Sequence, residues 1–184
     1  MAQQKVLKNW LQVSSLRITR VRFALIAVFI MSTLAADAWN LIPGGTVLQR
    51  WTVLALVTVL NTVFWYASRT TVKSEVYYKS LIFSQIVMDI LVVSLFVYSQ
   101  RGIASNAAIL YALPIISSAT LLTRSAVYAT ATICASAYSL TAIRYQFLHP
   151  GEAYKVELYG ELFFYCAVFF FIAALLQIII RSKK

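Results

Sequence analysis

Charged residues are scarce in this chain of 184 residues: Asp, Glu, Lys and Arg together make up only 12%, whereas 61% of the residues are hydrophobic. Soluble domains carry about 25% charged residues, so the chain has too little polar surface to cover a soluble globule. Since a spanning helix needs about 20 apolar residues, the length allows six spans with short connections and no separate soluble domain. We therefore predict an all-α integral membrane protein with a bundle of six transmembrane helices.

Residue types that usually carry chemistry are scarce as well. The one histidine, His149, falls in an expected loop, and the two cysteines, Cys134 and Cys166, fall within expected spans without the spacing of metal ligands. The chain contains no Gly-rich phosphate loop, no CxxC pair and no recognisable catalytic set of Ser, His and Asp. We therefore expect no catalytic residue, no metal site, no cofactor and no enzymatic activity of this chain by itself.

Acidic residues number only six against sixteen basic ones, which gives a formal charge of +10. The sidedness of the basic residues explains this balance without a nucleic-acid partner. If the N-terminus faces the cytoplasm, twelve of the sixteen fall on inner segments. The other four fall on outer segments or outer span ends, namely Arg50, Arg101, Arg144 and Lys155. Because inner loops carry an excess of Lys and Arg, we predict six crossings with both termini cytoplasmic.

Six apolar runs define a single expected membrane domain, residues 21–184. The spans are predicted at about residues 21–41, 47–67, 80–100, 106–122, 125–147 and 159–180. The run over 125–147 is dense in Ala, Ser and Thr, which let helix backbones approach closely, so we expect an interior helix there. The run over 159–180 is rich in Phe and is predicted to face lipid.

Residues 1–20 form a separate basic segment before the first span. Trp10 and Val13 recur at helical spacing, whereas Lys5 and Lys8 fall on another face. This pattern is typical of a short amphipathic helix that lies in the cytoplasmic headgroup layer, with the tryptophan as its interfacial anchor. A frayed basic tail is the alternative.

One ionisable side chain, Asp89, lies near the middle of a predicted span. A carboxylate at that depth costs about 2.5–3.5 kcal/mol on insertion scales, so a neighbouring helix, water or a proton must make it tolerable. Gln85 precedes it by four residues and shares its face of the helix. The other intramembrane candidates are Asn61, Tyr111 and Pro114. A fixed interhelical hydrogen bond is the alternative interpretation for Asp89 and Asn61.

A second group of candidates lies towards the expected outer face. In chain order it comprises Asp37, Trp39, Arg144 and Glu161. Polar groups around one end of a helix bundle can line a pocket for a small solute. A carboxylate that water or headgroups solvate at the interface is the alternative for Asp37.

Several motifs in the middle of the chain follow a known pattern. They are DILVVSLFVY at 89–98, Arg101-Gly102, Ser105, LYALPII at 110–116 and LLTR at 121–124. Together they resemble the six-span sensor region of bacterial histidine kinases, of the kind found in type IV pilus and nitrogen-type sensor kinases. In that family an Asp-Ile-Leu start leads to a Gly-containing outer turn, an apolar helix with Tyr or Pro, and a basic inner turn. Here Gly102 stands alone where many members have two glycines.

The resemblance implies the sensing domain of a two-component histidine kinase in the bacterial cytoplasmic membrane. Because the outer loops are short, the stimulus is expected in or next to the bilayer, and helix repacking would relay it through the last span. Expected partners are the lipid bilayer, a second copy in a homodimer, and a membrane protein or apolar ligand. A kinase of this kind continues into a coiled connector, a phospho-accepting helix and an ATP-binding domain. This chain ends four residues after Ile180, so we expect either the membrane part of a longer receptor or a stand-alone relative.

Two other functions fit the same composition. The small solute-binding membrane subunit of an importer resembles this chain in size and number of spans, and the outer-face residues would line its pocket. A membrane scaffold or assembly subunit needs no ligand at all. A solute that copurifies at the outer face would favour the importer subunit, whereas kinase sequence following Lys184 would favour the sensor.

Overall fold

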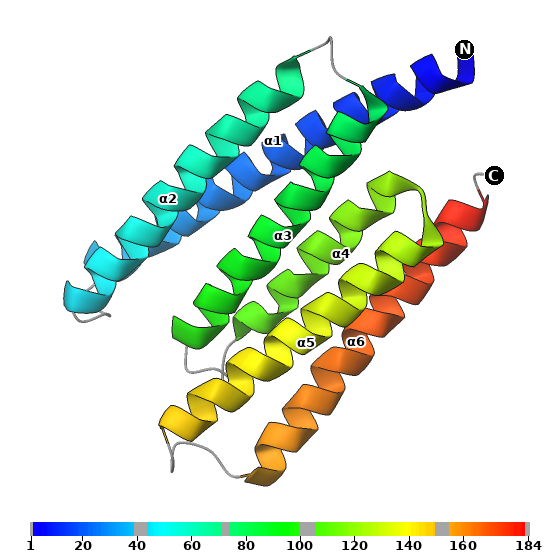
Figure 1. The fold of residues 1–184 in the computed structure, drawn as a ribbon. Helices are drawn as coiled ribbons and strands as arrows, with labels where there is room; N and C mark the ends of the chain where they lie inside the picture. The colour runs from blue at the N-terminus through cyan, green and yellow to red at the C-terminus, as the bar shows by residue number, and fades with distance from the viewer. Residues whose placement is uncertain (1, 39–43, 71–73, 100–105, 150–154, 183–184) are drawn as a thin grey trace. The chain divides into compact units, whose positions relative to one another are not determined.

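The computed structural model describes residues 2–38, 44–70, 74–99, 106–149 and 155–182 of the chain. Within these ranges the backbone is helical apart from short connections, and no strand is present (Figure 1). The elements, with η marking 3₁₀ helices, are α1 (Ala2–Ala38), α2 (Gly44–Arg69), α3 (Glu75–Ser99), η2 (Asn106–Tyr111), α4 (Ala112–Ser118), η3 (Ala119–Leu121), α5 (Arg124–Leu148) and α6 (Lys155–Ser182). The prediction of an all-α protein is confirmed.

Five helical segments are long and apolar enough to cross a membrane, and each overlaps a predicted span. They are Asn9–Ala35, Arg50–Arg69, Glu75–Ser99, Arg124–Leu148 and Tyr159–Ile180. The remaining predicted span, 106–122, corresponds to a shorter apolar helix, Ala107–Leu121. Its two ends are 3₁₀ helices, which rise about 2.0 Å per residue instead of about 1.5 Å. Fewer residues therefore cover a given depth of membrane in this segment.

Pro114 explains why this segment is not a regular α-helix. Proline has no N–H to donate to the carbonyl of Leu110, four residues earlier. The chain enters as the 3₁₀ helix η2 and passes into α4 just before the proline. One turn beyond it, the Ser118 hydroxyl donates to the carbonyl of Ile115 at 2.6 Å. Leu122 then adopts a left-handed conformation, with φ of 56°, and ends the segment before α5 begins.

The N-terminal helix differs from the expected separate interfacial helix over residues 1–20. That segment is helical, but α1 runs without a break from Ala2 to Ala38, so the basic residues belong to the start of the spanning helix. No Gly or Pro precedes Pro43 to end the helix earlier. Leu11 and Ser15 are buried, so tertiary packing also holds this part. At about 1.5 Å per residue α1 is about 55 Å long, which exceeds a hydrocarbon core of about 30 Å.

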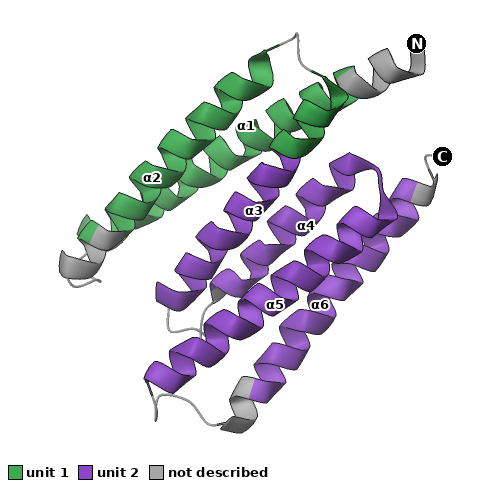
Figure 2. Cartoon of the chain, in the orientation of Figure 1, with its two compact units in different colours: residues 1–81 green, residues 82–184 purple. Residues whose placement is uncertain are grey.

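The chain divides into two compact units, residues 1–81 and 82–184 (Figure 2). Unit 1 contains α1 and α2, which pack against each other, together with the first residues of α3. Unit 2 contains the rest of α3 and all later elements. In unit 2, α5 packs against α6, and α4 packs against both.

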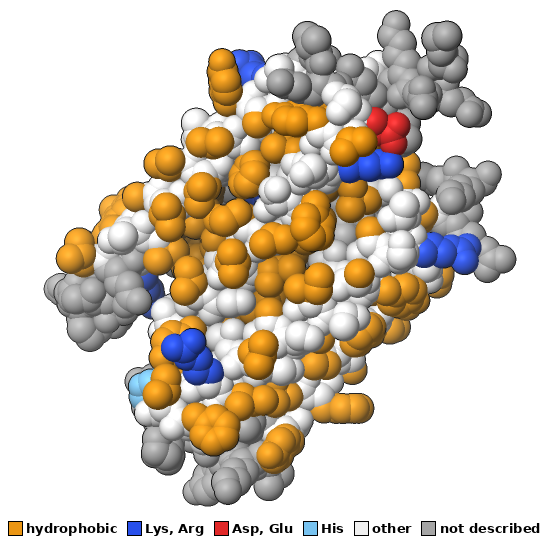
Figure 3. All heavy atoms as spheres, viewed as in Figure 1, with side chains coloured by type: hydrophobic (Ala, Val, Ile, Leu, Met, Phe, Trp, Pro, Cys, Tyr) orange, Lys and Arg blue, Asp and Glu red, His pale blue; other side chains and the backbone are white. Residues whose placement is uncertain are grey.

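The helices α5 and α6 show how small and large side chains are distributed in unit 2. The buried residues of α5 recur every three or four positions, as expected for one helix face: Val127, Thr130, Ala131, Cys134, Ala135, Tyr138 and Ala142. The other face is exposed, so the predicted interior helix is interior on one side only. On α6, Phe163, Phe164, Phe170 and Phe171 are exposed and Phe169 is buried. On the face drawn in Figure 3, hydrophobic side chains are spread along the helices, which suits a surface that contacts lipid.

Candidate functional site

The predicted polar stripe of α3 lies on the buried face of that helix. Gln85 is fully buried, and Asp89, one turn further on, is half-buried. The same face carries the buried residues Ile82 and Val93. The Asp89 carboxylate is close enough to the Cys134 thiol of α5 for the two groups to interact electrostatically. The acid therefore lies on the side of α3 that is covered by protein, where its solvation depends on neighbouring helices.

A hydrogen bond joins α3 to the segment that contains Pro114. The Ser94 and Tyr111 hydroxyl oxygens are 2.6 Å apart. Ser94 donates its only proton to the carbonyl of Ile90 at 2.7 Å, so the Tyr111 hydroxyl must be the donor in the bond to Ser94. Tyr111 is the last residue of η2 and is fully buried. The interruption of the helix before Pro114 thus places this hydroxyl against α3.

Four rings from three elements form an aromatic cluster in unit 2: Tyr111 of η2, Tyr138 of α5, and Tyr165 and Phe169 of α6. The closest centroid distances are 5.2 Å for Tyr138–Tyr165 and 5.6 Å for Tyr111–Phe169. Tyr111 and Tyr138 are 6.1 Å apart, in an edge-to-face arrangement. Such pairs contribute about 0.5–1.5 kcal/mol each beyond area burial. Through the Ser94 hydroxyl, the aromatic cluster is connected to α3 as well.

In unit 1, polar side chains line the contact between α1 and α2. The Asn61 side-chain amide donates to the carbonyl of Thr19 at 3.2 Å, so the interhelical hydrogen bond expected for Asn61 is present. Ser15 and Ser68 share a hydrogen bond of 2.7 Å, and Gln12 donates to the Ser68 carbonyl at 3.3 Å. These pairs fix the two helices as antiparallel. They also place the N-terminal half of α1 beside the C-terminal half of α2.

A family model for the PilS-like transmembrane domain matches residues 3–183, which is nearly the whole chain. The chain belongs to this family. PilS-like domains are the six-span membrane domains of sensor histidine kinases, so the resemblance predicted from the motifs between residues 89 and 124 is confirmed. The protein is a multi-pass membrane domain of that type. No curated protein and no solved structure matches the chain.

The intramembrane candidates of this PilS-like domain do not form one site. Asp89 and Gln85 share a face of α3, and Tyr111 contacts the same helix through Ser94, whereas Asn61 belongs to the contact between α1 and α2. Pro114 acts on the backbone that carries Tyr111. Sequence reasoning missed Ser94 and three of the four rings, namely Tyr138, Tyr165 and Phe169. The signal for Tyr138 was available, because it falls at helical spacing from the small residues Cys134 and Ala142.

The expected outer-face group is not assembled into a site by the described residues. The side chain of Asp37 and the whole of Trp39 lie outside them. Arg144 and Glu161 are both exposed, and neither forms an ion pair within the described part of the PilS-like domain. A pocket for a polar solute at this end therefore has no support from these two residues.

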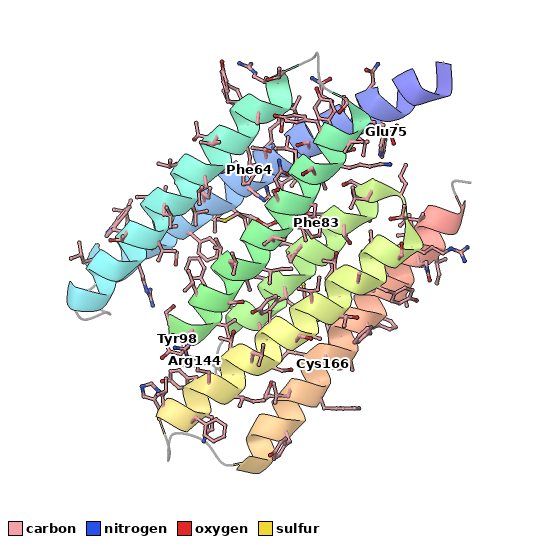
Figure 4. The ribbon with its side chains drawn as sticks, in the orientation of Figure 1. Phe64, Glu75, Phe83, Tyr98, Arg144 and Cys166 are labelled. Carbon is pink, nitrogen blue, oxygen red and sulfur yellow. The ribbon has the colours of Figure 1, made fainter. Side chains whose placement is uncertain are left out.

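Three rings contact one another in series at the end of unit 2 that carries Arg144: Tyr98, Tyr145 and His149. Figure 4 shows Tyr98 of α3 and Arg144 of α5 at this end, and the Tyr98 ring meets Tyr145 edge-on at 5.7 Å. His149 stacks on Tyr145 with centroids 4.3 Å apart, and its Nδ1 donates to the Tyr145 carbonyl at 3.2 Å. The histidine thus caps α5. Among the described residues, no three His, Cys, Asp or Glu side chains are placed to hold a metal ion.

Replacing the buried tyrosines of the aromatic cluster by phenylalanine is expected to have opposite effects at two positions. Tyr111→Phe removes the hydroxyl that donates to Ser94, so we expect it to lower the unfolding free energy by about 0.6–1.5 kcal/mol. The Tyr138 hydroxyl is buried and has no hydrogen-bond partner among the described residues. Tyr138→Phe removes this unsatisfied group and is expected to raise the unfolding free energy by up to about 1 kcal/mol.

Both free energies can be measured by reversible unfolding in mixtures of SDS and a mild detergent, followed by far-UV circular dichroism. The two variants lose the same atom from equally buried rings, so each serves as the control for the other. Equal losses at the two positions would contradict the hydrogen-bond assignment.

Proposed function

We propose that this PilS-like domain is the input domain of a two-component sensor kinase and detects a stimulus that arises in or next to the membrane. The longest connections between helices, residues 100–105 and 149–154, have six residues each. Segments of that length cannot form an extracellular ligand-binding domain. A lipid, an apolar ligand or a membrane protein that contacts the helices directly therefore fits better than a soluble ligand.

The observation that carries this proposal is the contact between α3 and the aromatic cluster. Ser94 of α3 meets Tyr111, and the Tyr111 ring meets Phe169 of α6 at 5.6 Å. Phe169 lies in the middle of α6, the last helix of the domain. A shift of α3 would move Tyr111 and would alter the packing of α6. Since interfaces in packed cores switch between discrete arrangements, such a shift can pass from the membrane to the segment beyond α6.

The distribution of basic residues agrees with a signal that leaves the domain through α6 on the cytoplasmic side. Twelve of the sixteen basic residues fall on one side of a six-span arrangement, and an excess of Lys and Arg marks the cytoplasmic side. We therefore propose that both termini face the cytoplasm of a bacterial inner membrane. In that orientation α6 ends on the side where ATP and the response machinery are found.

Asp89→Leu is expected to change the output of the native gene product. Asp89 is half-buried on the covered face of α3, where a polar contact inside a membrane protein is worth about 0.6–1.7 kcal/mol. If this contact differs between two packings, its loss shifts their ratio by about 3- to 18-fold. Asp89→Asn keeps the size of the side chain and part of its hydrogen bonding, so its level of phosphorylation should fall between those of the wild type and Asp89→Leu. The measurement is histidine phosphorylation in membrane vesicles supplied with labelled ATP. It is made with and without added lipid extracted from the native membrane, which would contain a lipid or apolar stimulus.

The matched control is Ser84→Leu, which removes a polar group from an exposed position of the same helix. We expect its phosphorylation to stay within about twofold of the wild type. If Asp89→Leu behaves like this control, the acid is only a structural contact. If neither the native gene product nor a copurifying kinase becomes phosphorylated, the proposed function is wrong.

A further inference from the structure

Basic residues gather at one end of unit 1. The Ser15–Ser68 contact marks this end, and the described cations near it are Arg17, Arg20, Arg22, Arg69 and Lys79. The only described acid of unit 1 whose side chain is placed is Glu75, which forms an ion pair with Lys79 at 2.6 Å. The charge at this end is therefore strongly positive, with one local counter-charge.

Most of these cations are already engaged. Lys79 is neutralised by Glu75. The Arg69 guanidinium lies over the Trp65 ring, 4.0 Å from its centroid, and Arg22 is half-buried. Two cations remain, and both are exposed.

The two remaining cations are Arg17 and Arg20 of α1. They are three residues apart and therefore adjacent on the helix surface. Neither pairs with a carboxylate anywhere in the described ranges of the chain. Two adjacent guanidinium groups repel each other unless an anion lies between them, so this position favours the binding of an anion.

The depth of the two arginines in the bilayer follows from the length of α1. Val28 and Met31 are exposed and lie on the same side of the helix as Arg17, so this side contacts lipid tails. Counting about 20 residues of hydrocarbon core back from Ala38, the end of α1, leads to about residue 18. Arg17 and Arg20 thus lie at the boundary of the core, where long basic side chains reach the phosphate layer.

We propose that Arg17 and Arg20 bind the headgroup phosphate of an anionic phospholipid in the leaflet at the N-terminal end of α1. A guanidinium group matches phosphate oxygens with two parallel hydrogen bonds. The exposed Trp10 lies two to three turns further out on the same side and suits the headgroup layer. Two unpaired charges discriminate between an anionic lipid and a zwitterionic one, whose own cation competes. This site does not depend on the sensing function proposed above.

The test is native mass spectrometry of the full chain in detergent, titrated separately with phosphatidylglycerol, phosphatidylcholine and inorganic phosphate. We expect phosphatidylglycerol to bind at least tenfold more tightly than phosphatidylcholine, and inorganic phosphate to form no adduct. The double variant Arg17→Gln/Arg20→Gln should lose about 30-fold in affinity for phosphatidylglycerol, because each basic residue near an anionic surface contributes about fivefold. Arg17→Lys/Arg20→Lys keeps the charges without the planar fork and should lose much less.

The matched control is Arg144→Gln, which removes an exposed arginine from unit 2 and should leave the affinity within about twofold. If the glutamine double variant does not fold, the salt dependence of lipid binding by the wild type tests the proposal instead. Added salt should weaken the binding of phosphatidylglycerol but not that of phosphatidylcholine. Equal affinity for the two lipids, an unchanged affinity in the folded double variant, or binding of free phosphate as tight as lipid would each overturn the proposal.

Discussion

Replacing Phe169 with alanine is expected to be the most destabilising truncation in unit 2. Its side chain is 0% exposed, and its ring contacts those of Tyr111 and Tyr138 at 5.6 and 6.2 Å. In soluble cores a Phe→Ala change costs about 3–5 kcal/mol. Because lipid already solvates the ring in the unfolded state, only the lost packing counts here, and we expect about 2–3 kcal/mol.

Phe171→Ala provides the control, because Phe171 lies two residues away on α6 and its side chain is 64% exposed. We expect its unfolding free energy in SDS and mild-detergent mixtures to stay within about 0.5 kcal/mol of the wild type. Similar losses for both variants would mean that α6 does not pack through Phe169.

The second large effect is expected from overfilling the contact face of α5. Ala131 is 0% exposed, and α5 packs against α4 and α6 on that face. A leucine there adds three carbon atoms to a fully buried site, which costs about 1–3 kcal/mol in well-packed cores. In a membrane protein we expect a loss of unfolding free energy in the upper part of the range of about 1–3 kcal/mol. The reason is that close approach of helix backbones is itself a main source of stability there.

Ala129→Leu is the matched variant, because Ala129 lies on the exposed face of the same helix. It places the same side chain towards lipid, and leucine is nearly as good a helix former as alanine, so we expect almost no change. The same unfolding assay compares the two. If Ala131→Leu were as stable as Ala129→Leu, the close packing of α5 described above would be wrong.

The packing of Phe169 and Ala131 bears on how a signal would pass from α3 to α6. Phe169 belongs to the aromatic cluster, and Ala131 lies on the buried face of α5, the helix that packs against α6. Close packing at such positions leaves little room for gradual deformation. A change that starts at α3 would therefore move α6 as a whole. Destabilised variants at Phe169 and Ala131 are expected to alter histidine phosphorylation together with the unfolding free energy. Asp89→Leu should alter histidine phosphorylation with a smaller change in the unfolding free energy.

Most of the secondary structure could be predicted from the sequence, because hydropathy decides it. Runs of apolar residues must be helical in lipid, where every backbone polar group needs an internal partner. The observed α2, α3, α5 and α6 agree with the predicted spans to within a few residues. The first helix was the exception, since basic residues before a span can lie in the interface or continue the helix. In the structure α1 is unbroken from Ala2 to Ala38, and the Ser15 hydroxyl is hydrogen-bonded to Ser68 of α2, a contact that apolar pattern alone does not predict.

The candidate site was predicted less completely. Asp89, Gln85 and Asn61 are conspicuous as polar residues in apolar surroundings, and Pro114 as a helix breaker. Tyr138 and Phe169 are not conspicuous, because eleven tyrosines and eleven phenylalanines occur in the chain. Which of these rings point inward depends on how the helices are rotated about their axes, and apolar sequence restricts that rotation weakly.

The sequence by itself determined that the protein crosses a membrane as helices, which family it belongs to and where its few polar groups fall along the spans. These follow from composition and local pattern, since transfer of apolar residues into lipid does not depend on distant parts of the chain. Only the tertiary structure decided that Ser94 meets Tyr111, that four rings from η2, α5 and α6 form one cluster, and that Arg17 and Arg20 stay exposed without a carboxylate in the described residues. Those contacts join residues far apart in sequence, and lipid solvates either face of an apolar helix almost equally, so close packing between helices had to select among the alternatives.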